Sequence, residues 1–371
     1  MTTISADNDR ARLERLRAES RKIRGVSLGR DAWRRLVRDH SAFAALIFLI
    51  LLAVLAVFTP FLPLQPPQKI DIDRKFAPPV VRPLFTHSAE WTDEAGNTIE
   101  DGIAEGFGNL NAFDLALLRV RASLFGRRQA TNWLGTDELG RDQLARLCWG
   151  ARVSLLVGLV AALVSLAIGV SYGAVSGYVG GWVDAAMMRL VDVLYSVPFI
   201  FIVIFLITVL SEPEVVKPWL QKHDIDRIMI FYVVVGGIYW LTMARVVRGQ
   251  VLSLKQQQFV EAARTIGAGR ARIIFQHIVP NLLSVIIVYL TLTIPRVMLF
   301  EAFLSFLGLG VEPPDVSWGL LANDGAKHIT PVGVVWWLIV GPGVALGATC
   351  VALNRLGDGL RDAFDPRLKN R

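Results

Sequence analysis

The chain alternates between long apolar stretches without charge and shorter polar stretches. The apolar stretches approach or exceed the roughly 20 residues that a helix needs to cross a bilayer, so the pattern predicts transmembrane helices rather than one large soluble core. Six spans are expected, at 43–62, 153–172, 190–210, 228–244, 282–304 and 332–354. The predicted fold class is therefore an all-α membrane protein, a bundle of six transmembrane helices.

Two of these spans have features that shape the expectation. No charge occurs from Val153 to Asp184, which is too long for one helix, so we expect the second span to end near Tyr172 and a bend to follow. Pro198 is expected to kink the third span. The first apolar run has no small-residue cleavage site and is expected to stay in the protein as a membrane anchor.

The polar stretches divide the chain into regions. The insert after the first span has mixed charge and little periodicity, and we expect it to be an external segment of mixed structure. The predicted organisation is a basic N-terminal tail at 1–40, a first transmembrane helix at 41–64, an external insert at 65–133, a core of five transmembrane helices at 134–354 containing a polar hairpin at 245–281, and a tail at 355–371.

The charge balance points to a membrane and not to nucleic acid. Hydrophobic residues make up 53% of the chain and charged residues only 19%, fewer than in most soluble proteins. The formal net charge is +7, but the basic residues lie in the tails and short loops and not on a soluble face interleaved with aromatics. We therefore expect membrane lipid as a partner and no nucleic acid.

Lysine and arginine also predict the orientation, because they collect in cytoplasmic loops. The loops at 211–227 and 305–331 are poorer in them than the hairpin, whose cations are Arg245, Arg248, Lys255, Arg264, Arg270 and Arg272. With six spans, the hairpin and both termini fall on the cytoplasmic side and the insert falls outside.

The hairpin itself is the most informative segment. Good helix formers run from 256 to 266, Gly267 and Gly269 interrupt them, and a second helix is expected from Arg270 until Pro280 marks the next span. Two short helices joined by a glycine turn, with small alanines on the first, suit close docking of another protein. The alternative is an ordinary amphipathic loop, and the residues alone leave both open.

Four glycines, Gly169, Gly173, Gly177 and Gly181, repeat every fourth residue. On a helix they form a stripe of small residues that lets a neighbouring backbone come close. The alternative is a flexible turn. We favour helix packing for the first two or three and a turn for 180–181.

Charges inside apolar spans are costly and often functional. Arg189 and Asp192 stand three residues apart and could pair on one helical face. For these two, an interfacial ion pair or snorkelling near a span end is favoured over a lining of the path or gate. Arg296 and Glu301 fall in the fifth span, where they either line a path or gate or form an interfacial ion pair. Neither interpretation is favoured by the sequence.

Catalytic and metal-binding signals are absent from the sequence. Cys148 and Cys350 lie in apolar segments and are interpreted as small hydrophobes. No histidine stands at metal-ligand spacing from another histidine or a cysteine, so no metal site is expected. The chain has no G-x-x-x-x-G-K-[ST] phosphate loop and none of the common hydrolase motifs, so no catalytic residue is predicted.

The hairpin resembles the EAA signature of permease subunits of binding-protein-dependent ABC importers. Glu261, Ala262, Ala263 and Gly267 match that signature in place, and 277–280 matches its ending with valine where leucine is usual. The resemblance implies a site that couples the permease to an ATPase, made of Glu261, Ala262, Ala263, Thr265, Gly267, Ala268 and Arg270.

Other segments resemble the second-permease group of the oligopeptide, dipeptide and nickel systems. They are Leu-Gly-Thr-Asp-Glu-Leu-Gly-Arg-Asp at 134–142 with Arg-Val-Ser-Leu-Leu at 152–156, the segments 304–311 and 313–319 after the fifth span, and the tail at 354–367. The insert at 65–133 is longer than in the compact members of that group.

The resemblance implies a type I importer bundle in a bacterial inner membrane, moved by partners. Those partners are a second permease, two ABC ATPase subunits and an extracytoplasmic substrate-binding protein, and this chain would hold no cofactor because ATP and Mg²⁺ would bind the ATPases. The implied function is ATP-driven import of peptides or peptide-like solutes. Alternatives are import of nickel chelates or another small solute by the same machinery, a stand-alone secondary transporter, or an intramembrane enzyme.

Overall fold

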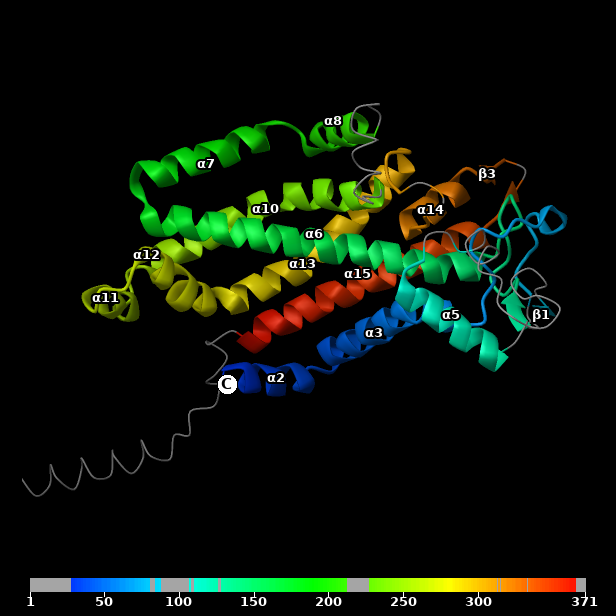
Figure 1. The fold of residues 1–371 in the computed structure, drawn as a ribbon, viewed down its shortest axis with the longest axis horizontal. Helices are drawn as coiled ribbons and strands as arrows, with labels where there is room; N and C mark the ends of the chain where they lie inside the picture. Colours follow the sequence, from blue (N-terminus) through cyan, green and yellow to red (C-terminus); the bar gives the residue numbers. More distant parts are fainter. Residues whose placement is uncertain are drawn as a thin grey trace, which may run out of the picture.

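The computed structural model describes residues 28–80, 84–87, 107, 110–125, 128–211, 227–311, 313, 315–331 and 333–364. Within these residues the chain is mostly helical, and the long helices run along one another in a single bundle (Figure 1). This confirms a helical fold, with two short antiparallel strand pairs as the exceptions. The tail before residue 28, the loop at 212–226, the C-terminal 365–371 and much of the insert lie outside the described residues.

The bundle is built from eight of the described helices, together with shorter elements at its two ends. These eight are α2 (Leu28–Arg38), α3 (His40–Val57), α6 (Gln143–Val179), α7 (Gly181–Ser196), α8 (Phe199–Ser211), α10 (Arg227–Leu254), α13 (Val279–Phe306) and α15 (Trp337–Phe364). The shorter helical elements are η1 (Thr59–Phe61), η2 (Ile72–Arg74), α5 (Ala112–Phe125), α11 (Gln258–Thr265), α12 (Arg270–Arg272), the π-helical turn η3 (Ile273–Ile278) and α14 (Trp318–Ala326). Strand β1 (Leu84–His87) pairs with β2 (Arg128–Thr131), and β3 (Ile329–Thr330) pairs with β4 (Gly333–Val334).

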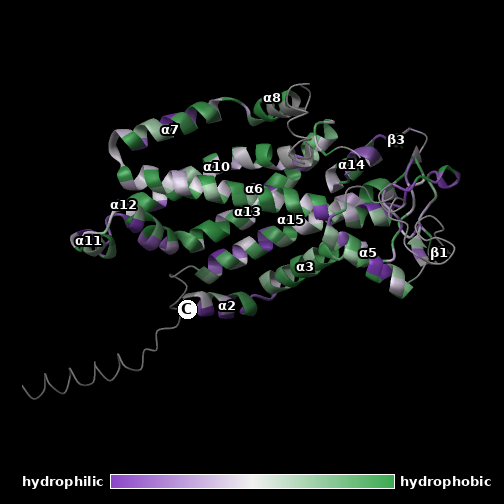
Figure 2. Ribbon diagram, in the orientation of Figure 1, coloured by the Kyte–Doolittle hydropathy of each residue, from purple (hydrophilic) through white to green (hydrophobic). Residues whose placement is uncertain are grey.

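Several helices are suited to crossing a membrane. Among the described residues, four helical runs are long and apolar enough, namely His40–Val57, Gln143–Val179, Arg270–Phe306 and Trp337–Phe364, and the bent pair α7–α8 adds a fifth if it is one span. Hydrophobic residues dominate these helices in Figure 2, whereas hydrophilic ones gather on α2 and around α12. The protein is therefore a multi-pass membrane protein. A sixth span would have to be α10, and the count of six stays a prediction.

The expected end of the second span near Tyr172 is wrong. Helix α6 continues without a break to Val179, and the chain turns only at Gly180 and Gly181, which both have positive φ (69° and 61°). The extra turns are held because α6 packs along α10 more extensively than any other pair of described elements. One long helix therefore takes up nearly all of the uncharged stretch. The chain turns only where two glycines allow a left-handed backbone.

The third span is broken and not merely kinked. Helix α7 ends at Ser196, α8 begins at Phe199, and the two are bent by 82°. Pro198 explains the break, because the residue before a proline is disfavoured from helical backbone, and Val197 is extended (φ −88°, ψ 126°).

Three further boundaries differ from expectation. The second hairpin helix is not separate, because α12, η3 and α13 follow one another without interruption from Arg270 to Phe306. Helix α15 extends ten residues past the predicted end at 354, since its last turns pack against α2 through a cluster containing Leu36 and Ala363. Helix α14 lies in a segment for which only a loop was expected; Ser317 caps it by accepting from Leu320 N.

Candidate functional site

The hairpin forms one end of the bundle, where α11 joins α10 to the run α12–α13 (Figure 1). Its first helix is fixed by two buried side chains, Val260 (0% exposed) and Ala263 (4%). They share one hydrophobic cluster with Val251 of α10 and with Ile274 and Ile278 of η3. A force applied to α11 is therefore passed directly to two long helices, because the contact is close-packed.

The glycine turn after α11 is a Schellman motif. Gly267 N donates to Arg264 O (2.9 Å), and Ala268 N donates to Ala263 O (3.0 Å). Those are the two hydrogen bonds that define the motif, in which the residue after the C-cap is left-handed. Gly267 occupies that position with φ 81°. A residue without Cβ is thus required by the backbone here, and not by crowding, since nothing lies within 4 Å of a Cβ built at this position.

The outward side of α11 is open to solvent. Glu261, Ala262 and Thr265 are exposed, and Ile266 at the tip is 83% exposed. The Thr265 hydroxyl donates to the Glu261 carbonyl (2.9 Å), so this threonine is satisfied within its own helix. The exposed side chain of Ile266 thus forms a small apolar surface with the carboxylate of Glu261 and the methyl group of Ala262 nearby. A surface of this kind is suited to contact with another protein.

The inward side of the turn borders a cavity of about 460 Å³, which is lined by Tyr178, Arg264, Ala268, Arg270 and Ile273. Arg264 Nε donates to the Tyr178 hydroxyl (3.3 Å), and the guanidinium lies 5.2 Å from the centre of that ring. Tyr178 was not among the residues selected from the sequence, because no local signal links α6 to the hairpin. Its position near the end of the longer-than-expected α6 is what brings it there.

The glycine stripe lies against α10. A Cβ at Gly169 would stand 2.8 Å from the Trp240 carbonyl oxygen, and one at Gly177 would stand 2.9 Å from that of Arg248. A Cβ at Gly173 would overlap the backbone of Ala244. The stripe therefore brings α10 to α6 at backbone contact immediately before the hairpin.

Two ion pairs fasten α7 to α10. Arg248 donates from Nε and Nη2 to the two carboxylate oxygens of Asp184 (2.6 Å each). Arg245 donates to Asp192 (2.7 Å) and lies 4.0 Å from the centre of the Tyr195 ring. The expectation that Arg189 pairs with Asp192 is wrong, because the tertiary fold brings Arg245 of α10 to that carboxylate.

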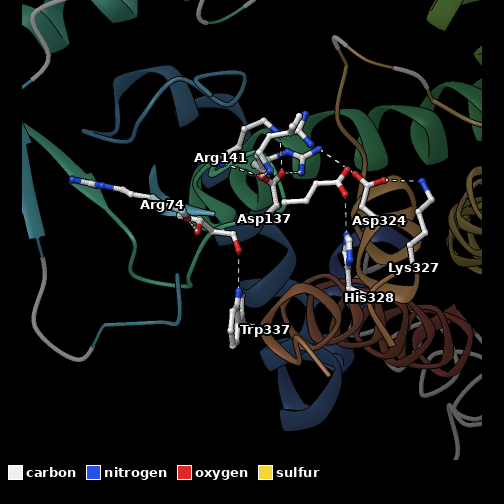
Figure 3. A network of polar contacts seen from close by, with 11 residues as sticks. Arg74, Asp137, Arg141, Asp324, Lys327, His328 and Trp337 are labelled. Atoms are coloured by element: carbon white, nitrogen blue, oxygen red, sulfur yellow. Dashed lines mark hydrogen bonds and ion pairs between the residues drawn. The ribbon is translucent and has the colours of Figure 1, made fainter. Parts of the chain in front are cut away.

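At the end of the bundle opposite the hairpin, the segment 134–142 is tied to α14 and α15 by a polar network (Figure 3). Asp137 accepts from Arg141 (2.7 Å) and from Arg146 (2.5 Å), and Arg146 is also 3.4 Å from Asp324. His328 Nε2 lies 3.2 Å from Glu138 Oε2. Trp337 Nε1 donates to the Thr136 carbonyl (3.0 Å).

Glu301 and Arg296 occupy different environments. Glu301 is fully buried, and its Oε1 accepts from Ser305 (2.8 Å) and Ser317 (2.7 Å), while its Oε2 has no hydrogen-bond partner within the described structure. It thereby ties the segment after α13 back onto that helix. Arg296 is exposed and lines a cavity of about 440 Å³ beside Tyr289 and Arg361. The two side chains do not form an ion pair with each other.

These features define a class: a multi-pass membrane protein whose bundle carries, at one end, an exposed hairpin packed against two long helices. The chain belongs to the family described as binding-protein-dependent transport system inner membrane component, which matches residues 169–370. Residues 27–79 match a second family, the N-terminal TM domain of oligopeptide transport permease C. The protein is thus a transport component of the inner membrane.

Individual relatives are similar over most of their length. The oligopeptide transport system permease protein OppC of Salmonella typhimurium is 49% identical over 236 residues, covering 64% of this chain and 72% of the relative. The protein of the same name from Escherichia coli is 46% identical over 239 residues (64% and 74%). The dipeptide transport system permease protein DppC of Bacillus subtilis is 39% identical over 240 residues (65% and 70%).

Proposed function

We propose that this chain is the permease subunit of an ATP-driven importer of peptides or peptide-like solutes. The family assignment and the peptide-transport names of its relatives support the substrate class. The observation that carries the mechanism is the rigid attachment of α11, through Val260 and Ala263, with the exposed tip at Ile266. A partner that binds such a helix can move the bundle as one rigid body.

In this proposal the partner at the hairpin is one of two ABC ATPase subunits, which bind ATP and Mg²⁺, while this chain holds no cofactor. The coupling site consists of Glu261, Ala262, Ala263, Thr265, Gly267, Ala268 and Arg270. A second permease of a different sequence completes the path, and an extracytoplasmic binding protein delivers the solute. The hairpin and both termini face the cytoplasm, and α10 and the pair α7–α8 complete six spans.

We further propose roles for the two charged residues of α13. A cation exposed on a membrane-spanning helix is costly against lipid, so Arg296 is assigned to a water-filled path. Glu301 is assigned to the outer gate, because its carboxylate holds the segment that follows α13 through Ser317.

The coupling role is tested by Ile266→Asp. A desolvated carboxylate in the docking surface should weaken association of the permease with its ATPases by roughly tenfold or more. The measurement is co-purification and titration with the two ABC ATPase subunits that the proposal requires. Ile329→Asp is the matched control, since Ile329 is also an exposed isoleucine (58%) but lies in β3 at the opposite end. Equal binding by Ile266→Asp and wild type would contradict the docking surface.

The gate role is tested by two substitutions at Glu301. Glu301→Gln keeps an oxygen that accepts from both serines, so we expect uptake of a radiolabelled peptide within about twofold of wild type. Glu301→Ala leaves two buried hydroxyls without that acceptor, at about 1–3 kcal/mol, and we expect uptake to fall roughly tenfold. If Glu301→Ala assembles and transports normally, the gate role is wrong. If Glu301→Gln assembles normally but takes up no peptide, the negative charge of Glu301 is needed for transport and its hydrogen bonds alone are not enough.

A further inference from the structure

Helix α2 precedes the first apolar helix and is held to the bundle by one face only. Ala32 (5% exposed) and Leu36 (3%) are buried in a cluster with Ala42 of α3 and Ala363 of α15. Asp39 then caps α3 by accepting from Ser41 N (2.9 Å) and Ala42 N (3.2 Å). The position of α2 beside the start of α3 is therefore fixed by packing on one side and by a helix cap at the joint.

The opposite face of α2 carries two parallel rows of exposed side chains. At 100° per residue, Trp33 and Val37 fall within about 40° of each other, and the three arginines at 30, 34 and 38 follow in an adjoining row. Trp33 is 53% exposed and Val37 is 39% exposed. The arginines of the second row, Arg30, Arg34 and Arg38, are all exposed.

These three arginines are not neutralised within the described part of the chain. Helix α2 contains four arginines and one aspartate, and Asp31 pairs with the fourth arginine, Arg35 (3.1 Å). Arg35 lies towards the packed side of α2. Asp31 therefore neutralises an arginine on that side, and the outer row of arginines keeps its positive charge. The outer face of α2 therefore combines three positive charges with an exposed tryptophan and an exposed valine.

We propose that this outer face of α2 binds the headgroups of anionic phospholipids, with Trp33 and Val37 in the boundary between headgroups and acyl chains. Guanidinium groups form paired hydrogen bonds with phosphate, and tryptophan favours the membrane–water boundary. The lipid surface is the occupant that the geometry favours, because α3 enters the apolar region two residues after Arg38. A protein partner would have to displace the lipid that surrounds the start of α3.

The test uses the full chain reconstituted in nanodiscs of phosphatidylcholine mixed with phosphatidylglycerol. Native mass spectrometry of the released protein measures whether phosphatidylglycerol is retained above its share of the mixture. We expect wild type to retain such an excess. The variant Arg30→Gln, Arg34→Gln, Arg38→Gln should lose it, with retention weakened on the order of 100-fold for three arginines near the surface. Glutamine and arginine have similar helix propensity, so α2 should still form.

Arg35→Gln is the matched control, because it removes one arginine of the same helix that is already paired with Asp31. We expect it to retain the excess of phosphatidylglycerol. Three results would overturn the proposal: no excess with wild type, an excess that survives the triple substitution, or an equal loss with Arg35→Gln. A further variant, Trp33→Ala, should lower retention of either phospholipid if the ring contacts the bilayer, and unchanged retention would contradict that contact.

Discussion

Replacing Gly267 with valine is expected to reduce peptide uptake by at least about tenfold while the membrane bundle stays folded. Gly267 has φ 81°, and a left-handed backbone costs an L-residue roughly 1–2 kcal/mol, more for a β-branched one. The Schellman hydrogen bonds would be lost or distorted, and α11 would change its angle to α12. The measurement compares uptake with ATP hydrolysis in the reconstituted transporter, and continued hydrolysis without uptake indicates uncoupling.

The control for this substitution is Gly269→Val. Gly269 lies two residues further on, in ordinary extended backbone (φ −68°, ψ 155°), with nothing within 4 Å of a Cβ built there. Uptake by this variant should be close to wild type. If both valines have the same effect, the left-handed turn is not the cause. If neither has an effect, the hairpin does not transmit the motion.

Replacing Gly173 with leucine is expected to push α6 away from α10 and destabilise the bundle. A Cβ at this position already overlaps the Ala244 backbone, which, unlike the end of a side chain, cannot rotate away. Overpacking of this kind costs roughly 1–3 kcal/mol or more, which in a chain of this length would lower the midpoint of thermal unfolding by about 1–4 °C or more. The measurement is the melting curve and the yield of monodisperse protein.

Gly237→Leu provides the comparison, since Gly237 lies in the partner helix α10, is exposed and has nothing within 4 Å of a Cβ. It should melt near the wild-type temperature. A stable, monodisperse Gly173→Leu protein would mean that α6 and α10 separate without cost, and the stripe would then have no role in packing.

Prediction from the sequence worked best where local chemistry decides the outcome. Gly267 ends α11 because the residue after a helix C-cap is often left-handed, and that preference is local. Pro198 interrupts the third apolar run for an equally local reason, although the extent of the 82° bend depends on how α7 and α8 pack. The length of α6 was misjudged because its uncharged stretch is longer than one membrane span needs, whereas its glycines let the whole helix pack along α10.

Contacts between distant segments were not predictable in the same way. Asp192 has an arginine three residues away in its own helix, yet its partner is Arg245, 53 residues further on. The segments at 134–142 and 313–319 carry no sign of each other in the sequence. In the fold, Arg146 contacts both Asp137 and Asp324 of α14, and Ser317 caps the start of α14. Such pairings depend on the relative positions of whole helices.

By itself, the sequence determined the membrane class, the positions of most apolar helices, the glycine turn of the hairpin and the resemblance to importer permeases, because hydrophobicity and backbone preference act over a few neighbouring residues. Only the tertiary structure decided that Val260 and Ala263 fix α11 to the bundle and that Glu301 is buried against two serines. It also decided that three arginines of α2 face outward, with no ion-pair partner among the residues that the structure describes. Burial and pairing depend on which helices come together, and that is decided by packing over the whole chain.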